Sequence, residues 1–124
     1  MTTPRVQAAY LRTICDGWCT QRRFQGRGAC AFGCQPGYDG LEHYACCTVV
    51  RHLFATGLNL QFPGASRCLD IFLCMSDVHE DELKSRAVGL YALYRLYNGI
   101  RYSHSIPREY QGAFNRFIIE GLKV

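Results

Sequence analysis

Three cysteines and a histidine, placed close together near the middle of the chain, constrain the fold more than any other feature. Cys30 and Cys34 enclose Gly33, and His43 and Cys47 follow after a loop rich in proline and glycine. Glycine can adopt the positive φ that folds Cys34 back toward Cys30, so that both thiolates reach one ion. Thiolates and an imidazole in such a pattern are typical of tetrahedral Zn²⁺. The sequence therefore predicts a zinc site formed by Cys30, Cys34, His43 and Cys47.

The second half of this site is predicted to lie on a helix over residues 41–56. Residues 39–42, Asp-Gly-Leu-Glu, match a capping box that starts a helix just before His43. On a helix His43 and Cys47 are four positions apart and share a face, so they can close the site opposite the first two thiols. Cys46, three positions from His43, lies on nearly the same face. It is the alternate fourth ligand, and the sequence leaves that choice open.

Other readings of these residues are weaker. The cysteines can be ordinary buried thiols, which pack as small hydrophobic side chains, but this does not explain why His43 shares their face. A catalytic zinc is disfavoured because four protein ligands leave no open coordination position. Glu42 beside His43 resembles a metalloprotease base, but the two-histidine helical motif is missing. With no phosphate-binding loop or nucleophile signature either, we expect the protein not to be an enzyme.

Four further cysteines are candidates for a second metal site. Cys15 and Cys19 are four residues apart and can pair with Cys68, Cys74 or Cys46. No second histidine stands at a convincing spacing from them. Buried core thiols are the alternative, and the spacing alone does not decide between the two.

The segment from Cys30 to Phe54 resembles a zinc-binding segment of a known family. Its two cysteines, acidic turn, helical histidine, final cysteine and following apolar helix are similar to the segment that follows the polymerase region in reverse transcriptases of non-LTR (LINE-type) retroelements. The resemblance covers about residues 10–60 and implies Cys30, Cys34, His43 and Cys47 as the ligands. The chain lacks the Tyr-x-Asp-Asp polymerase motif and is far too short for a polymerase. The resemblance therefore implies a freestanding or truncated zinc module.

The net charge is concentrated at the N-terminal end. Residues 1–30 carry five arginines against one aspartate, a balance of +4, whereas the remaining residues balance to zero. Arg22 and Arg23 lie between Trp18 and Phe24, with Arg27 close behind, and this mixture of arginine and aromatic side chains is typical of single-stranded nucleic acid binding. The segment is therefore a candidate site for RNA or DNA. A solvated surface with one aromatic core residue is the alternative.

Helical patterning predicts an all-α fold, a small bundle of about five helices with an inserted zinc knuckle. A single zinc-stabilised domain over residues 1–124 is expected, since a chain that is 48% hydrophobic can form one compact core. Besides the helix over 41–56, the predicted helices span residues 4–14, 67–75, 77–98 and 107–121.

The helix over residues 78–98 is apolar on two sides, with Leu90 on one stripe and Leu93 and Leu96 on the other. Such a helix is either enclosed in the core or shared with a partner, so a protein partner or homodimer is the alternative function. No signal-peptide pattern follows Met1, and no apolar run is long enough to span a membrane. We therefore expect an intracellular protein with reduced thiols and no membrane partner.

Overall fold

The computed structural model describes residues 4–14, 29–34, 39–60, 80–102 and 109–123. Helices are the regular elements of these residues, and no strand occurs among them, so the predicted all-α class is confirmed. Within this part of the chain the helices are α1 (Pro4–Ile14), α2 (Leu41–Tyr44), α3 (Thr48–Leu58), α5 (Glu80–Tyr102) and α6 (Tyr110–Leu122).

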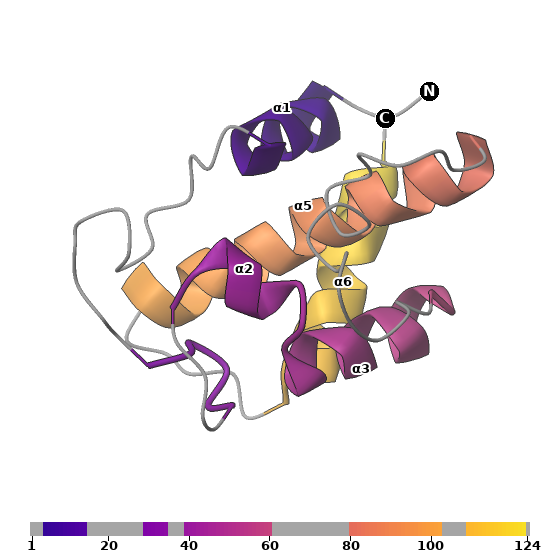
Figure 1. Cartoon of the computed structure of the whole chain (residues 1–124). Helices are drawn as coiled ribbons and strands as arrows, with labels where there is room; N and C mark the ends of the chain where they lie inside the picture. The colour runs from indigo at the N-terminus through magenta and orange to yellow at the C-terminus, as the bar shows by residue number, and fades with distance from the viewer. Residues whose placement is uncertain (1–3, 15–28, 35–38, 61–79, 103–108, 124) are drawn as a thin grey trace.

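The longest helix, α5, organises the bundle. It contacts α1, α3 and α6, and α6 also contacts α3. In Figure 1 α5 crosses the middle of the molecule, with α1 on one side of it and α3 on the other. The largest fully buried side chains come from all five described helices. They include Val6, Tyr44, Phe54, Leu90 and Phe114.

The close approach of α3 to α5 depends on Gly89. A Cβ atom at this position would lie 2.5 Å from Cε2 of Phe54 and 2.8 Å from Cδ1 of Leu58. Real Cβ atoms do not approach other carbons so closely, so a side chain here would push α3 away from α5. Phe54 in turn packs against Phe114 of α6, with ring centroids 5.3 Å apart. Gly89 therefore makes room on α5 for Phe54 of α3, which also packs against Phe114 of α6.

Both apolar stripes of α5 are buried within the chain. Leu90 and Leu93 are fully buried, and Leu96 is 1% exposed. The predicted partner surface on this helix is therefore wrong for Leu93 and Leu96, because α1, α3 and α6 already cover the helix on several sides. Leu83, near the start of α5, is the large hydrophobic residue of this helix that remains exposed.

Three predicted helix boundaries are also wrong. The helix expected over residues 41–56 is broken, since α2 ends at Tyr44 and Cys47 has an extended backbone with φ −62° and ψ 130° before α3 begins. The last helix begins at Tyr110, not near residue 107, because Glu109 is extended with φ −137°. At the other end of α3, Asn59 adopts the left-handed conformation and ends the helix two residues beyond the predicted stop at Gly57.

The helix predicted over residues 67–75 lies outside the described residues, as do Cys15, Cys19, Cys68 and Cys74 of the suggested second metal site. Among the helices that are described, none combines the length and the apolar character required to cross a membrane.

Candidate metal centre

Cys30, His43 and Cys47 converge at one end of the bundle. Their ligand atoms all lie within 4.8 Å of one another, although the residues come from the 29–34 turn, from α2 and from the start of α3. The two sulfur atoms are 3.9 Å apart. Two thiolates on a tetrahedral zinc with Zn–S bonds of about 2.3 Å are separated by about 3.8 Å. The distance between the two sulfur atoms therefore matches the spacing that a bound zinc imposes, and this distance is far too long for a disulfide bond.

The turn that presents Cys30 forms as the sequence predicts. Gly33 has φ 80°, and its N–H donates to the carbonyl oxygen of Cys30 at 3.1 Å. The backbone amides of Phe32 and Cys34 hydrogen-bond to the Cys30 sulfur and stabilise its thiolate. A turn whose amides point at a cysteine sulfur suits a metal thiolate, because the amide dipoles offset the negative charge.

The two sulfur atoms form a buried hydrogen-bonded pair. Hydrogen bonding from the Cys47 thiol is the main reason that the pKa of Cys30 falls from its ordinary 9.0 to about 5. The pKa of Cys47 is raised, first by that bond to Cys30 and then by burial, because losing its proton would place a second negative charge beside the first. His43 also hydrogen-bonds toward Cys30 and favours its thiolate. The lowered pKa of Cys30 favours the thiolate form, which is the form that binds a metal ion.

The break between α2 and α3 places Cys47 at the N-cap of α3. The amides of Val50 and Val49, which open this helix, favour the thiolate form of Cys47. An extended residue between the two helices, not one continuous helix, therefore brings His43 and Cys47 to the same site. The predicted pairing of these two residues is found, but by a different backbone path.

The remaining candidate ligands differ in position. Cys46 is exposed and outside the triad, so the structure selects Cys47 over the alternate. Cys34 is half-buried, with its sulfur 3.8 Å from the hydroxyl oxygen of Thr48, the residue after Cys47. It lies next to the triad without being part of it. Cys34 therefore stays a predicted fourth ligand.

A buried carboxylate supports this end of the molecule, and the sequence analysis missed it. Asp39, read as a helix cap, is 1% exposed, and its Oδ1 accepts hydrogen bonds from the hydroxyls of Tyr44 at 2.5 Å and Tyr97 at 2.9 Å. The Tyr44 hydroxyl accepts from the N–H of Ala31, beside Cys30, at 3.2 Å. Burial and the neighbouring Asp39 charge raise the pKa of Tyr44, so it remains a hydrogen-bond donor. The network connects the Cys30 turn, α2 and α5.

Aromatic rings surround this polar network. Phe32 meets Tyr44 edge-on at 5.5 Å and Tyr110 at 5.7 Å, and Tyr44 meets Tyr97 at 5.6 Å between centroids. Such edge-to-face contacts stabilise the fold by about 1 kcal/mol each beyond their buried area. Phe32 thus packs the 29–34 turn against α2 and α6, and Tyr44 connects α2 to α5.

The predicted nucleic-acid residues Trp18, Arg22, Arg23, Phe24 and Arg27 lie outside the described residues. Searches of protein-family models, curated proteins and solved structures found no match to this chain. The likeness to retroelement reverse transcriptases therefore stays a prediction.

Proposed function

We propose that this protein is a non-catalytic zinc-binding module in which Cys30, Cys34, His43 and Cys47 hold one structural Zn²⁺. The convergence of Cys30, His43 and Cys47, with sulfur atoms at the separation that zinc requires, carries the proposal. Sulfur and imidazole ligands favour zinc over magnesium or calcium, which prefer oxygen. Four protein ligands leave no open position, so the ion would stabilise the fold and not act on a substrate.

Cobalt(II) substitution tests this proposal. Apoprotein titrated with Co²⁺ should develop the visible bands of a tetrahedral ion together with thiolate charge-transfer absorption, both complete at about one equivalent. Cys34→Ser should weaken the charge-transfer band by one thiolate, whereas Cys46→Ser, at an exposed position, should leave the spectrum unchanged. An octahedral spectrum, or equal effects of the two serine variants, would contradict the ligand assignment.

We further propose that the zinc module serves nucleic acid binding, through Arg22, Arg23 and Arg27 with Trp18 or Phe24 stacking on a base. The support is the sequence, in which the whole net charge of +4 lies in residues 1–30. Arg22→Ala combined with Arg23→Ala should lower the affinity for a single-stranded oligonucleotide and reduce the salt dependence of binding. Unchanged affinity in this variant would count against the segment.

A further inference from the structure

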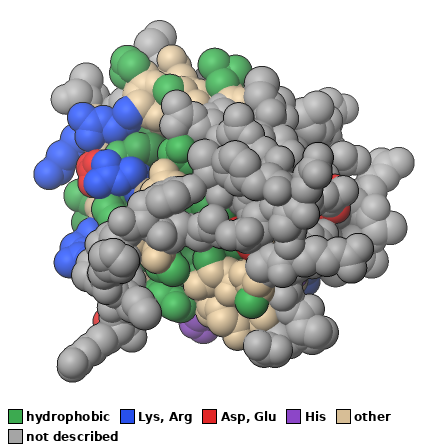
Figure 2. All heavy atoms as spheres, turned by 90° about the vertical axis from the view of Figure 1, so that its left-hand side faces the viewer, with side chains coloured by type: hydrophobic (Ala, Val, Ile, Leu, Met, Phe, Trp, Pro, Cys, Tyr) green, Lys and Arg blue, Asp and Glu red, His purple; other side chains and the backbone are tan. Residues whose placement is uncertain are grey.

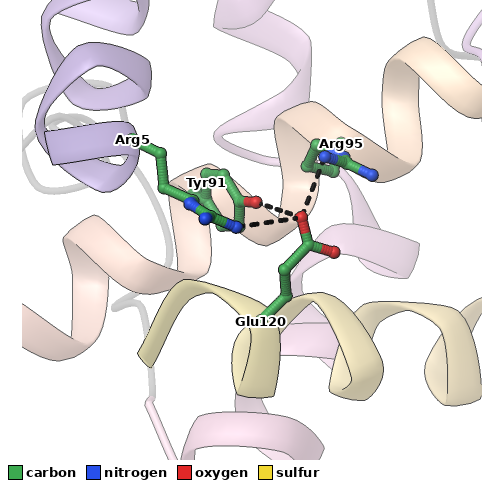
Figure 3. A network of polar contacts seen from close by, with 4 residues as sticks. All are labelled: Arg5, Tyr91, Arg95 and Glu120. Carbon is green, nitrogen blue, oxygen red and sulfur yellow. Dashed lines mark hydrogen bonds and ion pairs between the residues drawn. The ribbon is translucent and has the colours of Figure 1, made fainter. Parts of the chain in front are cut away.

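Three helices meet at one carboxylate on the face formed by α1, α5 and α6. Figure 3 shows Arg5 from α1, with Tyr91 and Arg95 from α5, converging on Glu120 of α6. One oxygen, Oε1 of Glu120, accepts from the Tyr91 hydroxyl at 2.6 Å and from Nη1 of Arg95 at 2.9 Å, and forms an ion pair with Nη1 of Arg5 at 3.6 Å. Two guanidinium groups share one carboxylate, so the junction keeps an excess positive charge.

The carboxylate holds both guanidinium groups close together while leaving them accessible. The side chain of Arg5 is 55% exposed and that of Arg95 is 46% exposed. Arg95 is also fixed by Phe117, whose ring centroid lies 4.9 Å from its guanidinium carbon. Each guanidinium has further N–H donors, and because both contact the same oxygen, one phosphate group can reach the two of them. Arginine side chains fixed in this way lose less conformational entropy when they bind an anion.

The surface around this junction is basic. Arg116 lies four positions before Glu120 and shares its face of α6, and Lys123 is the residue that directly follows this helix. Both side chains are exposed. Glu120 is the single acidic residue in the sequence of α6, and α1 has none. Figure 2 shows Lys and Arg side chains gathered along one side of the molecule.

We propose that this basic surface, defined as Arg5, Arg95, Arg116 and Lys123, binds the phosphates of a nucleic acid backbone. The inference extends the proposed nucleic acid binding, on which it rests, to residues that the sequence analysis did not select. Helix α1 carries Arg5 and leads in the sequence directly into the segment that contains Arg22 and Arg23.

A lipid surface fits these helices less well. Membrane-bound amphipathic helices need an exposed apolar face, but α1 and α6 bury theirs in the core through Val6, Phe114 and Ile118. Among the described side chains of these two helices, the exposed large aliphatic ones are Leu11, Ile119 and Leu122, each next to a charged residue in the sequence. Arginine-rich surfaces with few acidic residues suit a polyanion whose charges recur along a chain.

The test is fluorescence anisotropy of a labelled 20-nucleotide single strand and its duplex, titrated with zinc-loaded protein over a series of salt concentrations. Arg116→Gln combined with Lys123→Gln should lower the affinity about tenfold and reduce the salt slope by about 1 to 2. Lys84→Gln is the matched control, because it removes one charge from α5 about 16 Å along the helix from Arg95. Circular dichroism of each variant verifies that the helices are kept.

The outcomes separate this inference from the proposal on which it rests. A lower affinity of the combined Arg116→Gln and Lys123→Gln variant, with Lys84→Gln close to wild type, supports the basic surface. If only the combined Arg22→Ala and Arg23→Ala variant loses affinity, the basic surface is overturned and the proposal of nucleic acid binding stands. If Lys84→Gln, Arg116→Gln alone and Lys123→Gln alone lower the affinity equally, net charge alone explains the effect, and the basic surface is overturned too. A wild type that binds neither oligonucleotide, or binds only phosphatidylserine vesicles, removes both proposals.

Discussion

The two ends of this small bundle are held together by different chemistry. Around α5, buried aliphatic and aromatic side chains from α1, α3 and α6 fill a conventional core. At the metal end, a turn, the four-residue α2 and the start of α3 meet around a charged thiol pair and a buried carboxylate. The first end can fold by excluding water, whereas the second depends on polar groups being satisfied. Stability should therefore respond to metal and pH mainly at the metal end.

The largest effect is expected from a charge placed in the apolar core. Leu93→Asp puts a carboxylate at a fully buried position and should cost more than about 4 kcal/mol, which unfolds the chain with or without metal. Leu83→Asp, on the same helix at an exposed position, should change stability by less than about 0.5 kcal/mol. Circular dichroism with urea titration measures both. A folded, monomeric Leu93→Asp variant would show that this residue is a partner contact after all.

Removing the metal should separate the two ends. With chelator, or in His43→Ala, we expect hydrogen exchange in the 29–34 turn and in α2 to accelerate by a factor of 100 or more, while α5 and α6 remain protected. The apolar contacts between α5 and α6 do not involve the triad, which is the physical reason. Uniform acceleration across all helices would instead mean that one cooperative unit includes both ends.

A smaller effect is expected from the hydroxyl that connects the two ends. Tyr44→Phe leaves the N–H of Ala31 without its acceptor and removes one donor from the buried Asp39, which should cost about 1 to 3 kcal/mol. Tyr110→Phe, which keeps its edge contact with Phe32, is the control for loss of a tyrosine hydroxyl. Zinc affinity should fall about 10- to 100-fold in the first variant only, as for other groups that orient metal ligands. Equal zinc affinities for both variants would exclude a positioning role for Tyr44.

The last expected effect is a pH dependence of the metal-free protein. Cys30 has a pKa lowered from 9.0 to about 5 in the fold, so between pH 5 and 9 the unfolded chain binds one more proton and stability rises with pH. Above pH 9 the unfolded chain loses both thiol protons, whereas Cys47, with its raised pKa, keeps one, and stability falls. Urea midpoints in chelator should therefore peak near pH 9. Cys47→Ala should weaken this dependence, and a steady decline of stability from pH 5 upward would contradict the opposite pKa shifts of the two cysteines.

Local sequence signals predicted much of the helical core. Pro4 at a first-turn position placed the start of α1, and the apolar periodicity of α5 and α6 located both helices in the chain. Their boundaries were less accurate where no cap fixes them, as at Glu109. The sequence left the enclosed and shared alternatives open for α5, because burial on several sides depends on which helices pack against it.

The metal end was predictable in its residues but not in its backbone. The spacing of Cys30, His43 and Cys47 identified the triad, and Gly33 identified the turn. The extended backbone at Cys47 was not predicted, because it accompanies a contact with Cys30, which lies seventeen positions earlier in the chain. Asp39 was assigned to a local cap for the same reason, because its partner Tyr97 lies on a helix far along the chain. Long-range partners of polar groups do not appear in local periodicity.

The metal content of the protein tests the central claim most directly. Protein purified without chelator should contain about one zinc per chain by elemental analysis. His43→Ala and Cys47→Ala should lose that metal, whereas Cys46→Ser, at an exposed position outside the triad, should retain it. A wild type with intact helices, reactive thiols and no bound metal, even after incubation with zinc, would contradict the claim that the converging thiols and imidazole form a metal site.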